Sequence, residues 1–172
     1  MKRLILFRHG KSDWNARFPD DHSRPLTERG SKAARQMGKL LAVSSQVPRL
    51  IISSTAVRAR STVELAMEAG QWTAELQFSD VLYASSPARV LAFLHQLPDA
   101  EEEVMLVGHE PTWSGLVYGF SGARVRVPTA AMIAMQFPGE HWQDLHFDSG
   151  ELIWLLQPKF FKTLFAQESS VY

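Results

Sequence analysis

The chain of 172 residues contains no cysteine, which excludes disulfide bonds, thiolate nucleophiles and cysteine-ligated zinc or iron–sulfur sites. It also lacks an excess of either charge, because 18 lysines and arginines balance 18 aspartates and glutamates. A neutral chain has no overall field that would attract nucleic acid or an anionic membrane surface. We therefore expect no nucleic-acid partner and no membrane partner. Any anion that binds must be held by cations placed close together.

Long hydrophobic runs are absent as well. The first run, residues 4–7, is shorter than a signal-peptide core of about 7–15 residues, so we expect a cytoplasmic protein. The uncharged stretches 111–123 and 127–139 fall short of the ~20 residues that span a bilayer. The length favours a single domain over residues 1–172, with a core of about 2–158 and a C-terminal tail, 159–172.

Short apolar runs alternate with amphipathic segments along the chain. The runs predict buried strands at residues 4–7, 50–52, 104–107, 132–137 and 152–156, with a weaker candidate at 73–78. The expected helices run from Thr27 as N-cap to about Val43, from Ser54 as N-cap to Gly70, from Ser86-Pro87 to Pro98, and from near Pro111 to around Gly119. This order predicts a three-layer α/β/α sandwich with a mostly parallel sheet and one antiparallel strand.

Arginine and histidine follow three of the predicted strands. Arg8 and His9 come after the first strand, Arg58 lies at a helix start after the second, and His109 follows residues 104–107. Ligands of such sheets bind beyond the carboxyl ends of the parallel strands, where these side chains should meet. Two guanidinium groups and two helix N-termini suit a phosphoryl group. Neighbouring arginines keep an imidazole neutral, so that it can attack phosphorus.

Four motifs carry a resemblance to a known family. They are Arg8-His9-Gly10 with Ser12, Trp14 and Asn15; Arg24-Pro25-Leu26-Thr27-Glu28-Arg29-Gly30; Ser53-Ser54 with Arg58-Ala59 and Thr62; and Gly108-His109. In this order, from residue 4 to about residue 156, they resemble the histidine phosphatase superfamily, which has the phosphoglycerate mutase-like fold. The short chain and the forms RHGKSDW and VGHEP are similar to its small phosphohistidine phosphatase branch, the SixA type.

The resemblance implies a role for each matching residue. His9 would attack phosphorus and carry the phosphoryl group transiently, while Arg8 and Arg58 hold the non-bridging oxygens and His109 stabilises the transferring group. Phosphate or substrate binding would involve Ser12, Asn15 and Arg24, the last at the rim of the pocket. Water would then hydrolyse the phosphoenzyme, and the family implies neither a metal nor an organic cofactor.

The chain departs from the larger family members at their acidic proton donor. The corresponding region, residues 78–85, holds only Asp80, and Glu110 is a further possible acid. An alkyl alcohol needs a proton to leave, whereas the imidazole of phosphohistidine departs more easily. We therefore expect a phosphorylated protein bearing phosphohistidine as substrate. The alternatives are a phosphatase or mutase acting on a small phosphorylated metabolite, and a catalytically silent module that binds phospho-ligands.

Other polar and aromatic residues favour structural interpretations. His22 is expected at the surface, with a place near the pocket mouth as the alternative. His141 and His146, with nearby aspartates, lack a recognised metal-ligand spacing and indicate an exposed connection. The C-terminal aromatic cluster is expected to pack back on the domain; its members are Phe160, Phe161, Leu164 and Phe165.

Overall fold

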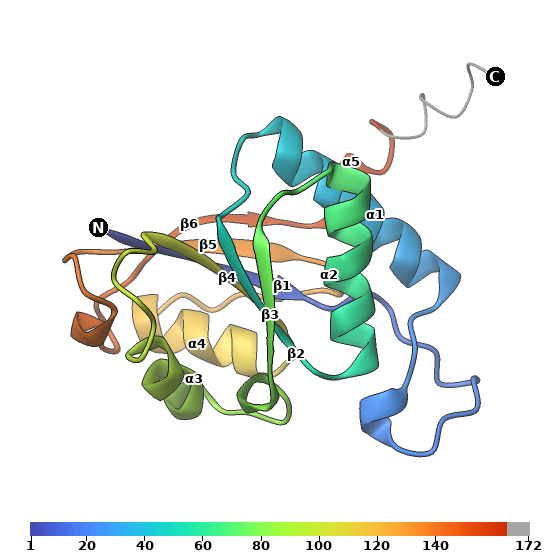
Figure 1. The fold of residues 1–172 in the computed structure, drawn as a ribbon, viewed down its shortest axis with the longest axis horizontal. Helices are drawn as coiled ribbons and strands as arrows, with labels where there is room; N and C mark the ends of the chain where they lie inside the picture. Colours follow the sequence, from blue (N-terminus) through green and yellow to red (C-terminus); the bar gives the residue numbers. More distant parts are fainter. Residues whose placement is uncertain (165–172) are drawn as a thin grey trace.

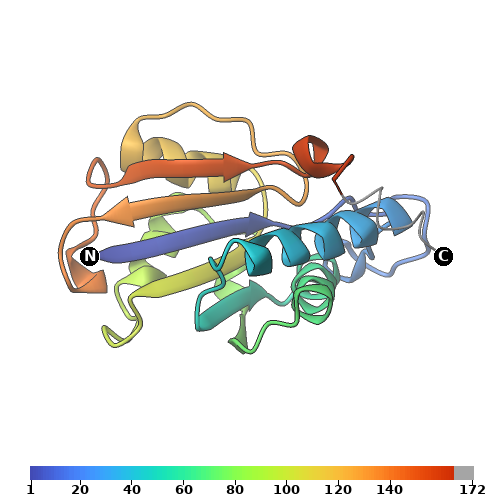
Figure 2. The ribbon, with the colours of Figure 1, turned by 90° about the horizontal axis from the view of Figure 1, so that it is seen from above.

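The computed structural model describes residues 1–164, and its centre is a mixed six-stranded sheet in the order β3-β2-β4-β1-β5-β6 (Figure 1). The strands are β1 (Lys2–Arg8), β2 (Leu50–Ser54), β3 (Glu75–Ser79), β4 (Glu103–Gly108), β5 (Met132–Phe137) and β6 (Glu151–Leu156). Strands β1 to β4 run parallel, and β5 is antiparallel to both β1 and β6. Figure 2 shows the β5 arrow pointing against its two neighbours. The expected mostly parallel sheet with one reversed strand is therefore confirmed.

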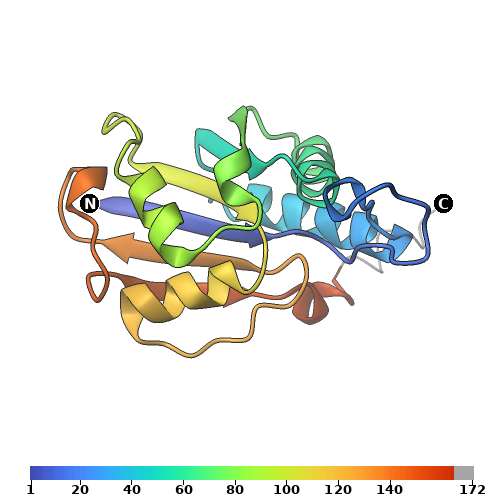
Figure 3. The same cartoon turned by 90° about the horizontal axis from the view of Figure 1, so that it is seen from below.

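Helices cover both faces of the sheet, as the predicted three-layer α/β/α architecture requires. One face carries α1 (Glu28–Val43), α2 (Val57–Gly70) and the short α5 (Pro158–Phe161). The other face, turned toward the viewer in Figure 3, carries α3 (Pro87–Leu94) and α4 (Thr112–Ser121). Three short 3-10 helices complete the described chain: η1 (Asp21–Ser23), η2 (Asp80–Leu82) and η3 (Trp142–Asp144).

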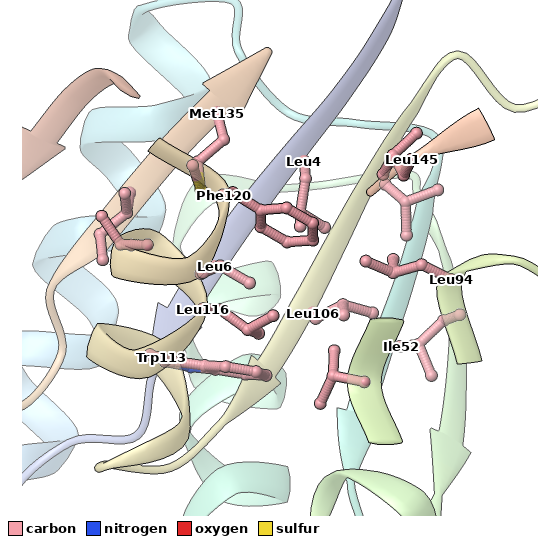
Figure 4. Close-up of a cluster of buried hydrophobic side chains, with 14 of the residues drawn as sticks. Leu4, Leu6, Ile52, Leu94, Leu106, Trp113, Leu116, Phe120, Met135 and Leu145 are labelled. Atoms are coloured by element: carbon pink, nitrogen blue, oxygen red, sulfur yellow. The ribbon is translucent and has the colours of Figure 1, made fainter. Parts of the chain in front are cut away.

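The apolar residues of β1 supply both cores, because successive side chains of a strand point to opposite faces. Leu4 and Leu6 pack with the residues of α3 and α4, whereas Ile5 and Phe7 pack with those of α1 and α2. All four side chains are fully buried. Figure 4 shows Leu4 and Leu6 facing the side chains of α4. A central strand buried on both sides holds the residues that follow it in a fixed place.

Two of the predicted helix caps form and one does not. Thr27 accepts a hydrogen bond from the Gly30 N–H at the start of α1, and Ser86 caps α3 as expected. The Ser54 cap is wrong, because β2 extends through Ser54 and α2 begins only at Val57, without a side-chain cap. Ser54 therefore stays at the strand end, where its hydroxyl accepts a hydrogen bond from the Ala56 N–H over 3.2 Å.

The helix ends and the C-terminal segment also differ from expectation. α3 ends at Leu94 rather than at Pro98, and α4 continues to Ser121, where Gly122 adopts a left-handed conformation. In the tail, Phe161 packs against the core beside α1, but the other described members, Phe160 and Leu164, are 76% and 64% exposed. Packing back is thus confirmed for Phe161 and wrong for those two. Phe165 lies outside the described residues.

Candidate active site

The two histidines meet at the carboxyl end of the sheet. His9 follows β1 and His109 follows β4, and these strands are adjacent and parallel with Arg8 opposite Gly108. The His9 N–H donates to the Gly108 carbonyl over 3.0 Å. As a result the two imidazole centroids lie 5.2 Å apart, and the residues are only 7% and 8% exposed.

The loop after β1 is tied to both helices that cover it. A Cβ atom on Gly30, in the first turn of α1, would lie 2.2 Å from the Lys11 carbonyl oxygen, so only glycine allows the loop to cross there. The Gly10 N–H donates to the Thr62 hydroxyl over 2.9 Å, and that hydroxyl donates to the Arg58 carbonyl over 2.6 Å. The loop therefore holds His9 at a fixed position relative to the start of α2.

The ring contacts of His9 define its protonation state. Its Nδ1 lies 2.6 Å from the Gly10 carbonyl oxygen, which can only accept, so Nδ1 carries the hydrogen and Nε2 keeps a free lone pair. Burial is the main cause that lowers the pKa of His9 to about 4; the Gly10 contact raises this pKa, and the charges of Arg58 and Arg8 lower it. At neutral pH His9 is an uncharged imidazole with a nucleophilic Nε2.

His109 is held in the same neutral state. Its Nε2 lies 2.8 Å from the Ser54 hydroxyl, the group that the prediction had placed at a helix cap. Burial, together with repulsion from His9 and Arg58, lowers the pKa of His109 to about 3. Its Nδ1 is buried without a hydrogen-bond partner.

Three arginines lie around the imidazoles: Arg24 and Arg58 are buried, and Arg8 is partly exposed. Arg8 donates from Nη1 to the Val127 carbonyl over 2.8 Å, and Arg58 donates from Nη1 to the Asp21 carbonyl over 2.7 Å. Arg24 bonds the Ser12 hydroxyl through Nη1. In each of the three guanidinium groups Nε is buried and has no partner. Unpaired buried donors cost about 1–3 kcal/mol each, which an oxyanion would recover by binding them.

Asp21 and Tyr83 belong to this site although sequence reasoning did not include them. The Asp21 carboxylate accepts hydrogen bonds from Arg24 Nη2 (2.9 Å), Arg58 Nη2 (3.0 Å) and the Tyr83 hydroxyl (3.0 Å). These bonds, led by that of Arg24, lower the pKa of Asp21 to about 2, so the group is ionised. The available signal was an acidic turn three residues before Arg24; nothing local indicated Tyr83.

His22 lies at the mouth, the alternative left open by the sequence. Its ring packs edge-on against Tyr83 with centroids 4.9 Å apart, and the Tyr83 ring lies 5.7 Å from His109. The His22 Nε2 atom lies 2.9 Å from the Thr55 hydroxyl. We call the partly exposed edge formed by Asp21, His22 and Tyr83 the aromatic rim.

The remaining predicted residues lie at varying distance from this centre. Ser12 pairs with Arg24, whereas Asn15 is exposed and its backbone N–H bonds Asp13. The Asp80 carboxylate accepts from the Thr55 hydroxyl over 2.5 Å. The Glu110 carboxylate accepts from the Ser114 N–H (3.1 Å) and hydroxyl (2.6 Å), so it lies against the first turn of α4. Neither candidate acid bonds to His9 or His109.

Metal ligands do not gather in the part of the chain that the structure describes. Residues 1–164 contain no group of three or more histidine, cysteine, aspartate or glutamate side chains able to hold a metal ion. The exposed His141 instead pairs with Asp99 over 2.8 Å. Across the same residues, no helix is both long and apolar enough to cross a membrane.

Comparison with known proteins agrees with this geometry. Residues 4–83 match the family model of the histidine phosphatase superfamily, branch 1. An uncharacterised chloroplastic protein of Arabidopsis thaliana is 30% identical over 182 residues, covering 99% of this chain and 80% of the relative. SixA from Agrobacterium tumefaciens superposes with a TM-score of 0.77 at 27% identity, covering 91% and 98% of the two chains.

A second solved structure, the protein histidine phosphatase SixA complexed with tungstate, has a TM-score of 0.80 at 21% identity. It covers 92% of this chain and 99% of its own, and it shows the shared fold. The fold and the histidine–arginine site thus define a phosphatase class. The chain belongs to the histidine phosphatase superfamily, and its structure is of the SixA-like, phosphoglycerate mutase-like type.

Proposed function

We propose that this phosphatase removes the phosphoryl group from phosphohistidine in proteins, with His9 as the nucleophile. The main support for the proposal is the protonation state of His9. Its Nδ1 hydrogen is committed to the Gly10 carbonyl, its pKa is about 4, and its Nε2 lone pair stays available at neutral pH. Few neutral side chains other than imidazole can attack phosphorus without first losing a proton.

The neighbouring groups supply the charge that the transfer needs. Arg8 and Arg58 would hold the non-bridging oxygens through donors that include their unpaired Nε–H groups, and His109 would contribute a further hydrogen bond. The bond from His9 Nε2 to phosphorus forms as the bond from phosphorus to the substrate breaks. Water then attacks the phosphoenzyme, which releases inorganic phosphate and restores neutral His9.

The positions of the two acidic candidates support a nitrogen-bound phosphoryl group as substrate. Glu110 is engaged by Ser114 and Asp80 by the Thr55 hydroxyl, so each carboxylate already accepts a hydrogen bond away from the histidine pair. An alkyl ester would need such a group to protonate its alcohol. Phosphohistidine does not need it, because imidazole is a far better leaving group.

Trapping the phosphoenzyme tests the proposal. We expect the wild-type protein to take up label from a ³²P-phosphohistidine protein in an acid-labile, alkali-stable form. His9→Ala should lose both labelling and turnover. His146→Ala is the matched control, because His146 lies in an exposed loop far along the chain. Full turnover by His9→Ala would refute the assignment of the nucleophile.

A substrate panel distinguishes the alternatives. We expect a higher kcat/KM for a phosphohistidine protein than for alkyl phosphate metabolites. A preference for the metabolites, lost in Asp80→Asn or Glu110→Gln, would instead establish the small-molecule phosphatase or mutase. Binding of phosphate with no turnover and no phosphoenzyme would establish the silent binding module.

A further inference from the structure

The aromatic rim is more open to solvent than the histidine pair. Phosphoryl transfer places the leaving atom in line with the nucleophile and on the opposite side of phosphorus. His9 is 7% exposed at the floor of the site, whereas the Asp21 side chain is 48% exposed. A departing group that reaches solvent on this more open side would pass Asp21, His22 and Tyr83.

Asp21 binds Arg24 and Arg58, two of the arginines proposed to hold the substrate, and keeps part of its hydrogen-bonding capacity open. Arg58 donates to Asp21 through Nη1 and Nη2, which form the end of the guanidinium, and its Nε–H remains unpaired. A carboxylate has about four acceptor positions, and three on Asp21 are taken, two of them on Oδ2. One position on Oδ1 of an ionised, half-exposed carboxylate therefore remains for a donor from outside.

We propose that the aromatic rim is a leaving-group subsite for imidazole, in which the Asp21 carboxylate accepts a hydrogen bond from the second ring nitrogen of phosphohistidine. This inference rests on the proposed function and names the residues that select its substrate class. Tyr83, whose hydroxyl is fixed on Asp21, offers its ring as a packing surface for the departing five-membered ring beside His22.

The subsite explains how the reaction proceeds without a dedicated acid. The carboxylate favours the form of the substrate whose second ring nitrogen is protonated, a phosphoimidazolium. Neutral His9 attacks through Nε2, the phosphorus–nitrogen bond of the substrate breaks, and its electron pair stays on the departing ring. Neutral imidazole leaves, and His9, which keeps its Nδ1 hydrogen, becomes the phosphoimidazolium. Charge and protons balance with no transfer to water.

The rim should therefore discriminate by leaving group. A phenolate that departs from phenyl phosphate gains negative charge and has no N–H, so Asp21 gives it no hydrogen bond and repels it. Removing the Asp21 charge should slow transfer from N-phosphoimidazole without slowing transfer from phenyl phosphate to the same extent. The substitution also changes how Arg58 and Arg24 are positioned, but both substrates need these arginines, so that effect cancels when the kcat/KM values of the two substrates are divided.

The test measures a selectivity ratio, defined as kcat/KM for N-phosphoimidazole divided by kcat/KM for phenyl phosphate. We expect Asp21→Asn to lower this ratio at least about tenfold, the lower end of what a hydrogen bond to a charged group is worth. Asp20→Asn is the matched control. The Asp20 carboxylate caps η1 through the Ser23 N–H, and asparagine caps equally well, so its ratio should stay unchanged.

The outcomes separate the two proposals. If the wild type turns over N-phosphoimidazole but Asp21→Asn slows both substrates equally, Asp21 only orients the arginines and the subsite is refuted. If the wild type turns over phenyl phosphate and not N-phosphoimidazole, the proposed function fails and the subsite fails with it. Should Asp21→Asn not fold, Asp21→Ser gives the same readout.

Discussion

Replacing His109 by glutamine should change how the stability of the protein depends on pH. The pKa of His109 falls from an ordinary 6.5 to about 3 in the folded protein, and that of His9 falls to about 4. At pH values between these folded-state pKa values and 6.5, the two histidines are protonated in the unfolded chain but not in the folded protein. The free energy of unfolding therefore decreases as the pH falls through this window and is fully retained only above about pH 7.

The size of this loss of unfolding free energy is set by protonation of the histidines in the unfolded chain. At pH 5, which lies above both folded-state values, each histidine costs about 1.36 kcal/mol for each of the ~1.5 pH units below 6.5, or about 2 kcal/mol. The wild type should thus lose about 4 kcal/mol from this pair between pH 8 and pH 5. His109→Gln, which can still bond the Ser54 hydroxyl, should lose about 2 kcal/mol less over the same range.

Urea unfolding of the two proteins at pH 8, 7, 6 and 5 provides the measurement. All other titrating groups are shared, so the difference between the two curves isolates His109. Asp21, with a pKa of about 2, contributes stability that is lost only below about pH 4 and does not enter this window. Parallel curves for wild type and variant would show that His109 takes up a proton in the folded protein, which would refute a buried neutral imidazole pair.

Two further variants test the arginine clamp and the helix packing. Arg58→Ala should lower kcat/KM by about 10²–10³, the usual cost of one preorganised donor of this kind, while Arg60→Ala, whose exposed guanidinium pairs with Glu64, should leave it unchanged; equal losses would contradict a specific role of Arg58. Gly38→Ala should destabilise the protein by about 1–3 kcal/mol in urea unfolding, because the added Cβ would lie 2.1 Å from the Ala66 carbonyl oxygen of α2. Helix propensity alone would stabilise this variant by about 1 kcal/mol, so the sign of the change decides between the two effects.

Local sequence patterns were sufficient to predict the strands and most helix starts of the fold. The short apolar runs correspond to strands because the part of a strand that is buried on both faces needs apolar residues at successive positions, as residues 4–7 of β1 have. Thr27 and Ser86 were predictable as caps because their side chains bond an N–H three residues away. Ser54 was not, because whether a residue at a strand–helix junction stays extended depends on the neighbouring strands. The exposure of Phe160 was not predictable either, because it depends on which side of the short helix α5 packs against the core.

The sequence by itself determined which residues could carry phosphoryl transfer: the order of strands and helices delivers Arg8, His9, Arg58 and His109 to the carboxyl ends of parallel strands. Tertiary structure alone decided the chemical state of these groups. The depressed pKa values arise from desolvation, which exists only in the folded core. Asp21 reaches Tyr83 across 62 residues, a contact that no local pattern encodes. The chain is neutral overall, yet the fold gathers a local cluster of arginines and sets which groups, such as Asp21, they bind.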